Sequence, residues 1–142
     1  MTRILKFASA GAFATLMAAV ALPAYGQVAE SAGEAALTEG EVKLARLLEG
    51  RVAGEPENCI MSRRIRDFDI IDRTALVYEV GDVLYVNYTQ LPEMIDDSDG
   101  LRTRQFGTTL CRQSIVTTFS RNNGLYTGNL FLTDFIPYRR VD

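Results

Sequence analysis

The 142-residue sequence contains no histidine and no tryptophan. Without an imidazole, the chain cannot form Ser–His or Cys–His nucleophilic sites, histidine-ligated zinc or histidine acid–base catalysis. It also lacks a phosphate-binding glycine loop, since Gly81 and Gly100 stand alone. We therefore expect a non-enzymatic protein with no catalytic residues, no metal ligands and no cofactor.

Long apolar runs are missing except at the start of the chain, where residues 8–22 are apolar. That run is too short and too rich in alanine for a comfortable membrane span. Signals typical of export flank it, namely a basic start (Arg3, Lys6), a helix breaker (Pro23) and a small-residue cleavage site (Ala24, Tyr25, Gly26). We interpret residues 1–26 as a signal peptide, with an uncleaved anchor as the alternative. The mature chain is expected to be periplasmic or secreted, without stable membrane insertion.

Positive charge is also in short supply. The chain has 15 basic and 18 acidic residues, and removal of Arg3 and Lys6 with the signal peptide leaves a net charge of −5. General binding to nucleic acids or anionic membranes requires a positive field that neutralises phosphates. We therefore expect no nucleic-acid partner. The sequence does not identify the partner, and a cell-envelope protein is one candidate.

Cysteine is scarce, with only Cys59 and Cys111. In an oxidising compartment an even number of cysteines favours a disulfide, so we predict a Cys59–Cys111 bond. It closes a loop of about 53 residues, for which the chain-entropy estimate is about 4 kcal/mol as an upper value. A redox pair or a catalytic thiol is the alternative, although neither cysteine lies in a C-x-x-C motif.

The strongest structural pattern is a central hairpin. Thr74–Val80 and Val83–Thr89 are rich in β-branched and aromatic residues, which favour strands. Gly81 and Asp82 separate these runs and suit a type II′ turn, because glycine accepts a positive φ. That turn sets the register, and the expected cross-strand pairs are Val80–Val83, Glu79–Leu84, Tyr78–Tyr85 and Val77–Val86.

Further strands are expected on either side of the hairpin. Arg66–Ile71 alternates and joins the hairpin through a tight turn at Asp72–Thr74, which completes a meander. Ser114–Ser120 is the clearest later strand. The remaining expectations are a short strand around Gln105–Phe106, a turn at Arg121–Gly124, and a last strand within Leu125–Ile136 that is broken near Gly128 and stopped by Pro137.

A helix is predicted from about residue 39 to residue 49. Thr38 and Glu41 have the spacing of a capping box, apolar residues recur at helical intervals, and Gly50 is placed to end the helix. The apolar stripe is expected to pack on the sheet, and a partner-binding helix is the alternative. Arg51–Asn58 is predicted to be a loop.

Together these elements predict a mainly β (α+β) fold. It consists of a small antiparallel meander sheet or partial barrel of about five to seven strands with one N-terminal helix. The expected organisation is a signal peptide (1–26), a flexible tail (27–37) and a single β-rich domain (38–142). A domain of this size buries a modest core, which a disulfide supplements.

Carboxylates are the remaining candidates for catalysis. Asp67 and Asp69 project from the same face of a predicted strand, about 7 Å apart by strand geometry, with Asp72 and Glu79 beside the meander. Glycoside cleavage uses two carboxyl groups at a set separation. A small carboxylate-based hydrolase is therefore an alternative, although a solvated edge strand explains the spacing more simply.

The segment Leu91–Thr103 is predicted to be a long polar loop. It carries three closely spaced aspartates, which are Asp96, Asp97 and Asp99. A calcium-loop frame with Gly100 at the sixth position puts Ile95 and Phe106 where oxygen ligands are required. The segment is therefore expected to be a solvated turn, without a metal.

Arginine and tyrosine suggest a binding surface. Arg63, Arg64 and Arg66 lie near the hairpin that carries Tyr85 and Tyr88, and both residue types are enriched at protein interfaces. A solvated face on which arginines pair with aspartates is the simpler interpretation.

Several short motifs form a set over residues 44–88. They are Gly50–Pro56, Cys59-Ile60, Arg64–Arg66, Ile71–Thr74, Gly81 and Tyr85–Asn87, with weaker matches at Leu110-Cys111 and Phe135–Pro137. The set resembles a family of small exported proteins of unknown function from alpha- and gammaproteobacteria. Members often carry two further cysteines, at positions where this chain reads 97–101 and 128–132 without cysteine. The resemblance implies that Cys59 and Cys111 remain as partners, and it supports export.

The expected function is thus that of an exported cell-envelope protein that acts as a non-enzymatic binding or structural module. The alternatives are a small carboxylate-based hydrolase and a secreted inhibitor that plugs another enzyme's cleft with the Leu91–Thr103 loop.

Overall fold

A computed structural model describes residues 36–105 and 107–141. These residues form one α-helix, two short 3-10 helices and ten strands. The elements are α1 (Glu39–Leu47), β1 (Arg51–Ala53), β2 (Cys59–Met61), η1 (Ser62–Arg64), β3 (Ile65–Ile71), β4 (Ala75–Val80), β5 (Val83–Asn87), η2 (Pro92–Met94), β6 (Asp99–Arg104), β7 (Thr109–Cys111), β8 (Ile115–Ser120), β9 (Tyr126–Phe131) and β10 (Ile136–Arg140). The predicted mainly β class with one N-terminal helix is confirmed. The predicted signal peptide and nearly all of the predicted tail lie outside the described residues.

All strand pairs are antiparallel, and they form three sheets that do not close into a barrel. The largest sheet has the order β1-β10-β5-β4-β3, the second is β6-β8-β9, and β2 pairs with β7. The central hairpin has the predicted register, with Tyr78 opposite Tyr85 and Val80 opposite Val83. Gly81 has a φ of 64°, as the first position of a type II′ turn requires.

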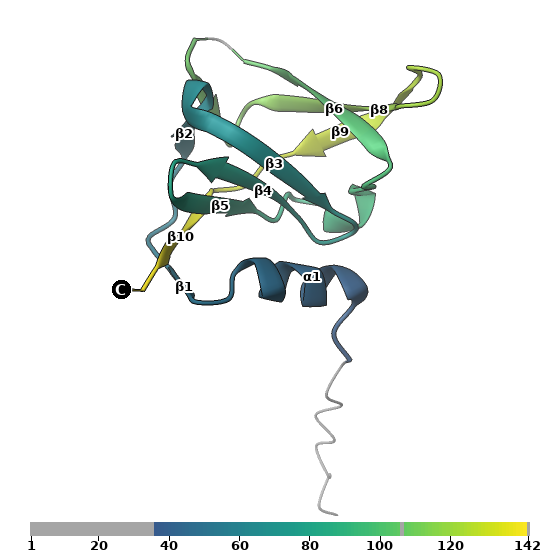
Figure 1. The fold of residues 1–142 in the computed structure, drawn as a ribbon. Coiled ribbons are helices and arrows are strands. Elements are labelled where there is room, and N and C mark those ends of the chain that lie inside the picture. The colour runs from purple at the N-terminus through teal and green to yellow at the C-terminus, as the bar shows by residue number, and fades with distance from the viewer. Residues whose placement is uncertain (1–35, 106, 142) are drawn as a thin grey trace, which may run out of the picture. The chain divides into compact units, whose positions relative to one another are not determined.

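The central strands β4 and β5 of the five-stranded sheet are covered on both faces (Figure 1). Because side chains alternate along a strand, Val77 of β4 packs with Leu44 of α1, whereas Leu76 and Tyr78 face the opposite core. That second core is shared with the three-stranded sheet through Val116 and other buried residues. The hairpin has apolar residues on both of its faces because it lies between α1 on one side and the three-stranded sheet on the other.

The helix begins with the predicted capping box. The Thr38 hydroxyl accepts a hydrogen bond from the Glu41 N–H (3.2 Å), and the Glu41 carboxylate accepts one from the Thr38 N–H (2.7 Å). The helix ends at Leu47, before the predicted end, and Gly50 turns the chain with a φ of 71°. The exposed positions of α1 carry mostly charged residues, so its apolar stripe serves packing.

The predicted disulfide between Cys59 and Cys111 is present. The two cysteines lie directly opposite each other in the small β2–β7 sheet. Ile60 and Leu110 form the next pair and point into the core beneath the three-stranded sheet. The bond therefore joins the start of the meander to a segment 52 residues further along the chain.

Asn87 ties the end of β5 to the connection between β9 and β10. Its side-chain amide donates to the Thr133 carbonyl (2.7 Å), and its side-chain oxygen accepts from the N–H groups of Thr133 and Thr89 (3.1 Å each). Asn87 is fully buried, and these bonds satisfy its own polar atoms together with backbone groups of buried Thr89 and half-buried Thr133.

Pro137 was wrongly expected to stop strand pairing. It lies inside β10, opposite Tyr85 of β5, and it is buried. Its carbonyl accepts from the Gly54 N–H (2.7 Å), so its missing N–H faces the side where β1 has already ended at Ala53. Proline is tolerated there because the pairing of β10 with β5 does not use its N–H.

Three other boundary predictions were wrong. The predicted loop Arg51–Asn58 contains β1 and a bridge from Glu57 to Phe135, and both depend on pairing with distant segments. Gln105 is outside any strand, and Phe106 is not among the described residues. The predicted last strand ends at Phe131 and does not reach Ile136, while the predicted break near Gly128 corresponds to a register shift at Thr127 within β9.

The predicted polar loop Leu91–Thr103 was wrong in its second half, because Asp99–Arg104 is strand β6. The sequence hides this strand since Leu101 is its only apolar residue. Pairing with β8 supplies the missing stabilisation. Among the described residues no helix has the length and apolarity that a membrane crossing requires.

Candidate functional site

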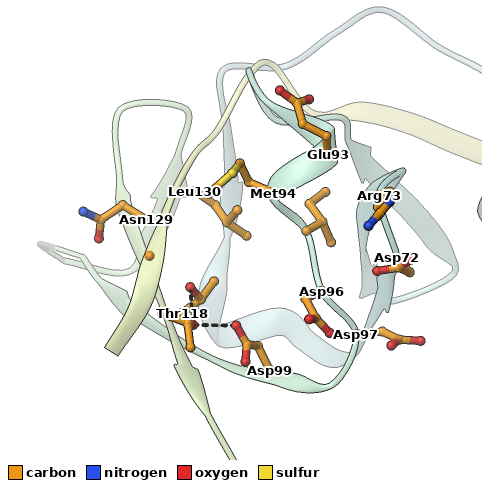
Figure 2. Close-up of a pocket in the computed structure, with 13 residues that line it drawn as sticks. Asp72, Arg73, Glu93, Met94, Asp96, Asp97, Asp99, Thr118, Asn129 and Leu130 are labelled. Carbon is orange, nitrogen blue, oxygen red and sulfur yellow. Dashed lines mark hydrogen bonds between the residues drawn. The ribbon is translucent and has the colours of Figure 1, made fainter. Parts of the chain in front are cut away.

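An acidic pocket of about 670 Å³ opens between the β3–β4 turn, the η2 region and β9 (Figure 2). Carboxylates dominate its polar lining, and they are Asp72, Glu93, Asp96, Asp97 and Asp99. Arg73 is the single basic residue of the lining. Arg73 has a φ of 48°, and its N–H donates to the Ile95 carbonyl (3.0 Å), which holds the turn against the η2 region.

Hydrogen bonds organise the side of the pocket nearest β8. The Thr127 hydroxyl bonds to the Asp99 carboxylate and lies 2.8 Å from the Thr118 hydroxyl. These three side chains come from β6, β8 and β9, so the strand register brings them together. The Asp99 side chain is therefore on the pocket side of the three-stranded sheet and points away from the opposite face of that sheet.

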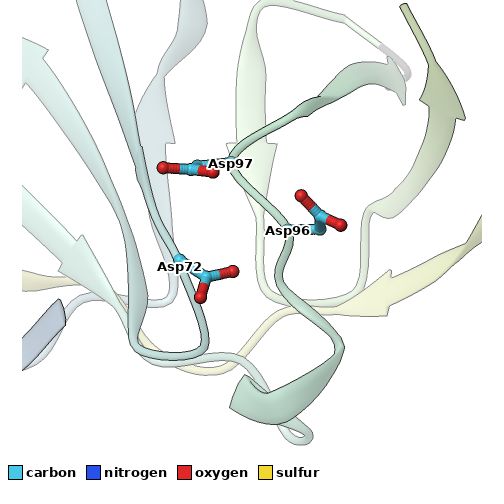
Figure 3. Close-up of side chains that lie close together, drawn as sticks. All are labelled: Asp72, Asp96 and Asp97. Carbon is cyan, nitrogen blue, oxygen red and sulfur yellow. The ribbon is translucent and has the colours of Figure 1, made fainter. Parts of the chain in front are cut away.

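Three aspartates of the pocket gather around one point (Figure 3). Asp72 comes from the β3–β4 turn, while Asp96 and Asp97 follow η2, and one oxygen of each lies within 4.8 Å of the others. All three residues are exposed. Hydrogen bonds from Ser98 lower the pKa of Asp96, so this carboxyl is ionised at neutral pH. Exposed acidic groups commonly gather without a metal, so these three carboxylates by themselves do not define a metal site.

The geometry does not assemble the catalytic pair that the sequence suggested. Asp72 lines the acidic pocket, but Asp67 and Asp69 are exposed residues outside its lining. The Asp67 carboxylate instead accepts from the Phe68 N–H (2.8 Å) on the edge strand. A glycoside hydrolase also needs a carboxyl with a raised pKa, whereas the pKa of Asp96 is shifted downwards.

The predicted arginine–tyrosine surface is also not assembled. Arg63, Arg64 and Arg66 line a pocket beside the β4–β5 turn, and neither tyrosine belongs to that lining. The Tyr85 hydroxyl lies 3.4 Å from the carboxylate of Glu57, while Tyr88 lines a pocket beside α1.

A different surface with arginine and aromatic residues covers the outer face of the three-stranded sheet. Cross-strand register places eight side chains on this face, and they are Arg102, Arg104, Ile115, Thr117, Phe119, Tyr126, Asn129 and Phe131. We call these residues the arginine–aromatic face. Ile115, Tyr126 and Phe131 are 55%, 64% and 52% exposed, respectively. Exposed apolar side chains gathered on one face indicate a binding surface.

The centre of the arginine–aromatic face is held in place. The Phe119 ring lies against Gly100 so closely that a Cβ at Gly100 would collide with it. The Arg102 guanidinium lies 5.3 Å from the centre of the same ring, in a cation–π contact. The Thr117 hydroxyl donates to the Asn129 side-chain oxygen (3.2 Å) across the neighbouring strands.

Sequence reasoning missed this face because its strands were not recognised together. The alternation of Ile115, Thr117 and Phe119 is visible in the predicted strand Ser114–Ser120. Arg102 and Arg104 have the same spacing, but they fall in a segment predicted to be mostly loop. The register between β6, β8 and β9 is what brings these residues side by side.

Comparison of the chain with protein-family models, with curated proteins and with solved structures found no match. The resemblance to a family of small exported proteins therefore stays a prediction based on the motifs in residues 44–88.

Proposed function

We propose that the protein is a non-enzymatic binding module of the bacterial cell envelope and that the arginine–aromatic face binds its partner. The observation that carries this proposal is the concentration of exposed Ile115, Tyr126 and Phe131 beside two arginines on one sheet face. Monomeric proteins seldom expose large contiguous apolar patches, and such patches mark interaction sites. Aromatic residues and arginine are also the types that interfaces favour.

Export is part of this proposal. It draws on the predicted signal peptide and on the motifs that resemble exported proteins. The Cys59–Cys111 disulfide agrees with it, because disulfides persist in oxidising compartments.

Two observations favour binding over the alternatives. A hydrolase requires convergent carboxyl groups with at least one raised pKa, and Asp67 and Asp69 lie outside the acidic pocket. An inhibitor requires a projecting loop, yet the Leu91–Thr103 segment is anchored by Ile95, which is 1% exposed, and ends in strand β6.

Site-specific photo-crosslinking tests the proposal. A benzoylphenylalanine is placed at Ile115 or Phe131 in cells that naturally export the protein, with Lys43 on the exposed side of α1 as the matched control position. We expect a discrete protein adduct from both face positions and none from Lys43. The adduct is identified, and its affinity for the purified wild-type chain is compared with that for Phe131→Ser.

Loss of affinity in Phe131→Ser is the expected result, because the partner then covers less apolar surface. Equal adducts from Lys43, or an affinity that Phe131→Ser leaves unchanged, would contradict the proposed binding surface.

A further inference from the structure

We infer that the partner of the arginine–aromatic face is an acidic protein surface in which carboxylates flank apolar side chains. This inference rests on the proposed function, because it names the chemistry that the same face recognises. It follows from the charge, the order and the apolar content of the face.

The charge of the face has the opposite sign to that of the chain. The chain carries a net charge of −3, yet the face has two arginines and no acidic residue among its eight side chains. Asp99, the carboxylate of β6, is bonded to Thr127 toward the acidic pocket. Neither Arg102 nor Arg104 forms an ion pair with another described residue. Both guanidinium groups are therefore available to carboxylates of a partner.

The arginines occupy one side of the face. Both belong to β6, which is an edge strand of the three-stranded sheet, while the exposed aromatic residues Tyr126 and Phe131 lie on β9 at the other edge. A complementary partner consequently places its carboxylates over β6 and its apolar side chains over β8 and β9. Such an arrangement determines the orientation of the bound partner in addition to attracting it.

One of the arginines is already positioned for binding. Arg102 lies over the Phe119 ring, and that ring is packed against Gly100. Ordering a flexible arginine on binding costs conformational entropy, and part of this cost is met before the partner arrives. The Arg102 side chain therefore loses less conformational freedom when its guanidinium group binds a carboxylate.

The apolar part of the face favours a protein over an anionic polysaccharide. Ile115 and Phe131 form a direct cross-strand pair, and each is more than half exposed. Neither side chain offers a hydrogen-bond donor or acceptor. Sugar hydroxyls pressed against this pair would lose water without gaining a partner, whereas apolar protein side chains would not.

Titration of the ¹⁵N-labelled protein with four polymers tests the inference. A poly(Glu,Tyr) copolymer supplies carboxylates and apolar rings, poly(Glu) supplies charge alone, poly(Lys,Tyr) reverses the charge, and polygalacturonate is an anionic glycan. We expect poly(Glu,Tyr) to bind at least about tenfold more tightly than the others, with amide shifts confined to β6, β8 and β9. Its affinity should fall as salt is added.

Matched double variants separate specific recognition from net charge. Arg102→Gln/Arg104→Gln should weaken poly(Glu,Tyr) binding about tenfold and flatten its salt dependence. Arg46→Gln/Arg140→Gln removes the same charge from α1 and β10, and it should bind like the wild type. Equal losses in the two double variants would overturn the inference, because the attraction would then come from overall charge.

The remaining outcomes also decide the matter. Equal binding of poly(Glu) would show that the apolar residues contribute nothing, and tighter binding of polygalacturonate would assign the face to a glycan. Either result overturns the inference. A face-specific crosslink together with no binding of any acidic polymer rejects the acidic partner but retains the proposed function. Absence of a face-specific crosslink rejects both.

Discussion

At the residue scale, Tyr78 is the aromatic centre of the core between the two larger sheets. Its ring stacks on Phe68 at 6.4 Å and meets the edge of Phe135 at 5.8 Å. Burial raises the pKa of Tyr78 well above its ordinary value of 10.0. The neutral phenol is thus favoured in the folded chain.

This burial predicts a loss of stability at alkaline pH. Because the folded pKa of Tyr78 is raised, its contribution is complete below about pH 10 and is lost as the pH rises above that value. Between about pH 8 and about pH 11 the free energy of unfolding should fall by about 1.4 kcal/mol more in the wild type than in Tyr78→Phe. Urea unfolding with the disulfide intact measures this difference.

The matched control for Tyr78 is Tyr126→Phe, because the Tyr126 ring is 64% exposed. Its alkaline decline should equal that of the wild type. A Tyr78→Phe variant that declined as steeply as the wild type would show that the burial of Tyr78 does not control the alkaline limit.

At the element scale, the sheets are held together by connections as well as by ladders. The link between β9 and β10 is docked on β5 through the three hydrogen bonds of Asn87. Asn87 occupies the last position of β5, where an amide has both a donor and an acceptor to offer two backbone segments.

Asn87→Ala should lower the free energy of unfolding by about 3 kcal/mol, because it removes three hydrogen bonds and leaves backbone groups of buried Thr89 and half-buried Thr133 without partners. Chemical denaturation of the oxidised protein gives the value. Asn129→Ala is the control, since Asn129 is exposed and should lose less than about 0.5 kcal/mol. Similar losses in the two variants would mean that the docking by Asn87 adds nothing beyond a surface hydrogen bond.

At the scale of the whole molecule, the disulfide connects segments that are far apart in the sequence. Cys59 precedes the meander, and Cys111 lies between β6 and β8. The bond therefore links the chain before the five-stranded sheet to the segment that leads into the three-stranded sheet.

The double variant Cys59→Ala/Cys111→Ala should be less stable by up to about 4 kcal/mol, because its unfolded chain regains loop freedom. Its unfolded state should also be less compact, so the denaturant m-value should rise. Urea titrations of the variant and of the oxidised wild type measure both quantities. An unchanged m-value together with an unchanged free energy of unfolding would contradict this account.

The sequence alone determined the local features of this protein. Turn chemistry at Gly81 set the register of the hairpin, the Thr38–Glu41 spacing set the start of α1, and two cysteines set the disulfide pairing. The first two features depend on residues that are close in sequence. The disulfide pairing follows because the chain has only two cysteines. Such signals are readable because backbone sterics and capping act within a few residues.

Only the tertiary structure decided which distant segments meet. The short strands β1 and β7 and the polar strand β6 carry weak patterns of their own, and they form because another strand lies beside them. Pro137 is accepted inside β10 because its nitrogen faces the side where β1 ends, which leaves the pairing with β5 intact.

The acidic pocket and the arginine–aromatic face also depend on both the sequence and the tertiary structure. Asp72 joins Asp96 and Asp97, and Arg102 joins Phe119 and Phe131, only through turns and registers that link separate parts of the chain. The sequence supplied the residue types and excluded histidine chemistry. Their arrangement depends on the fold. Strand pairing joins residues that are far apart in the sequence, and no repeating pattern in the sequence shows which segments pair.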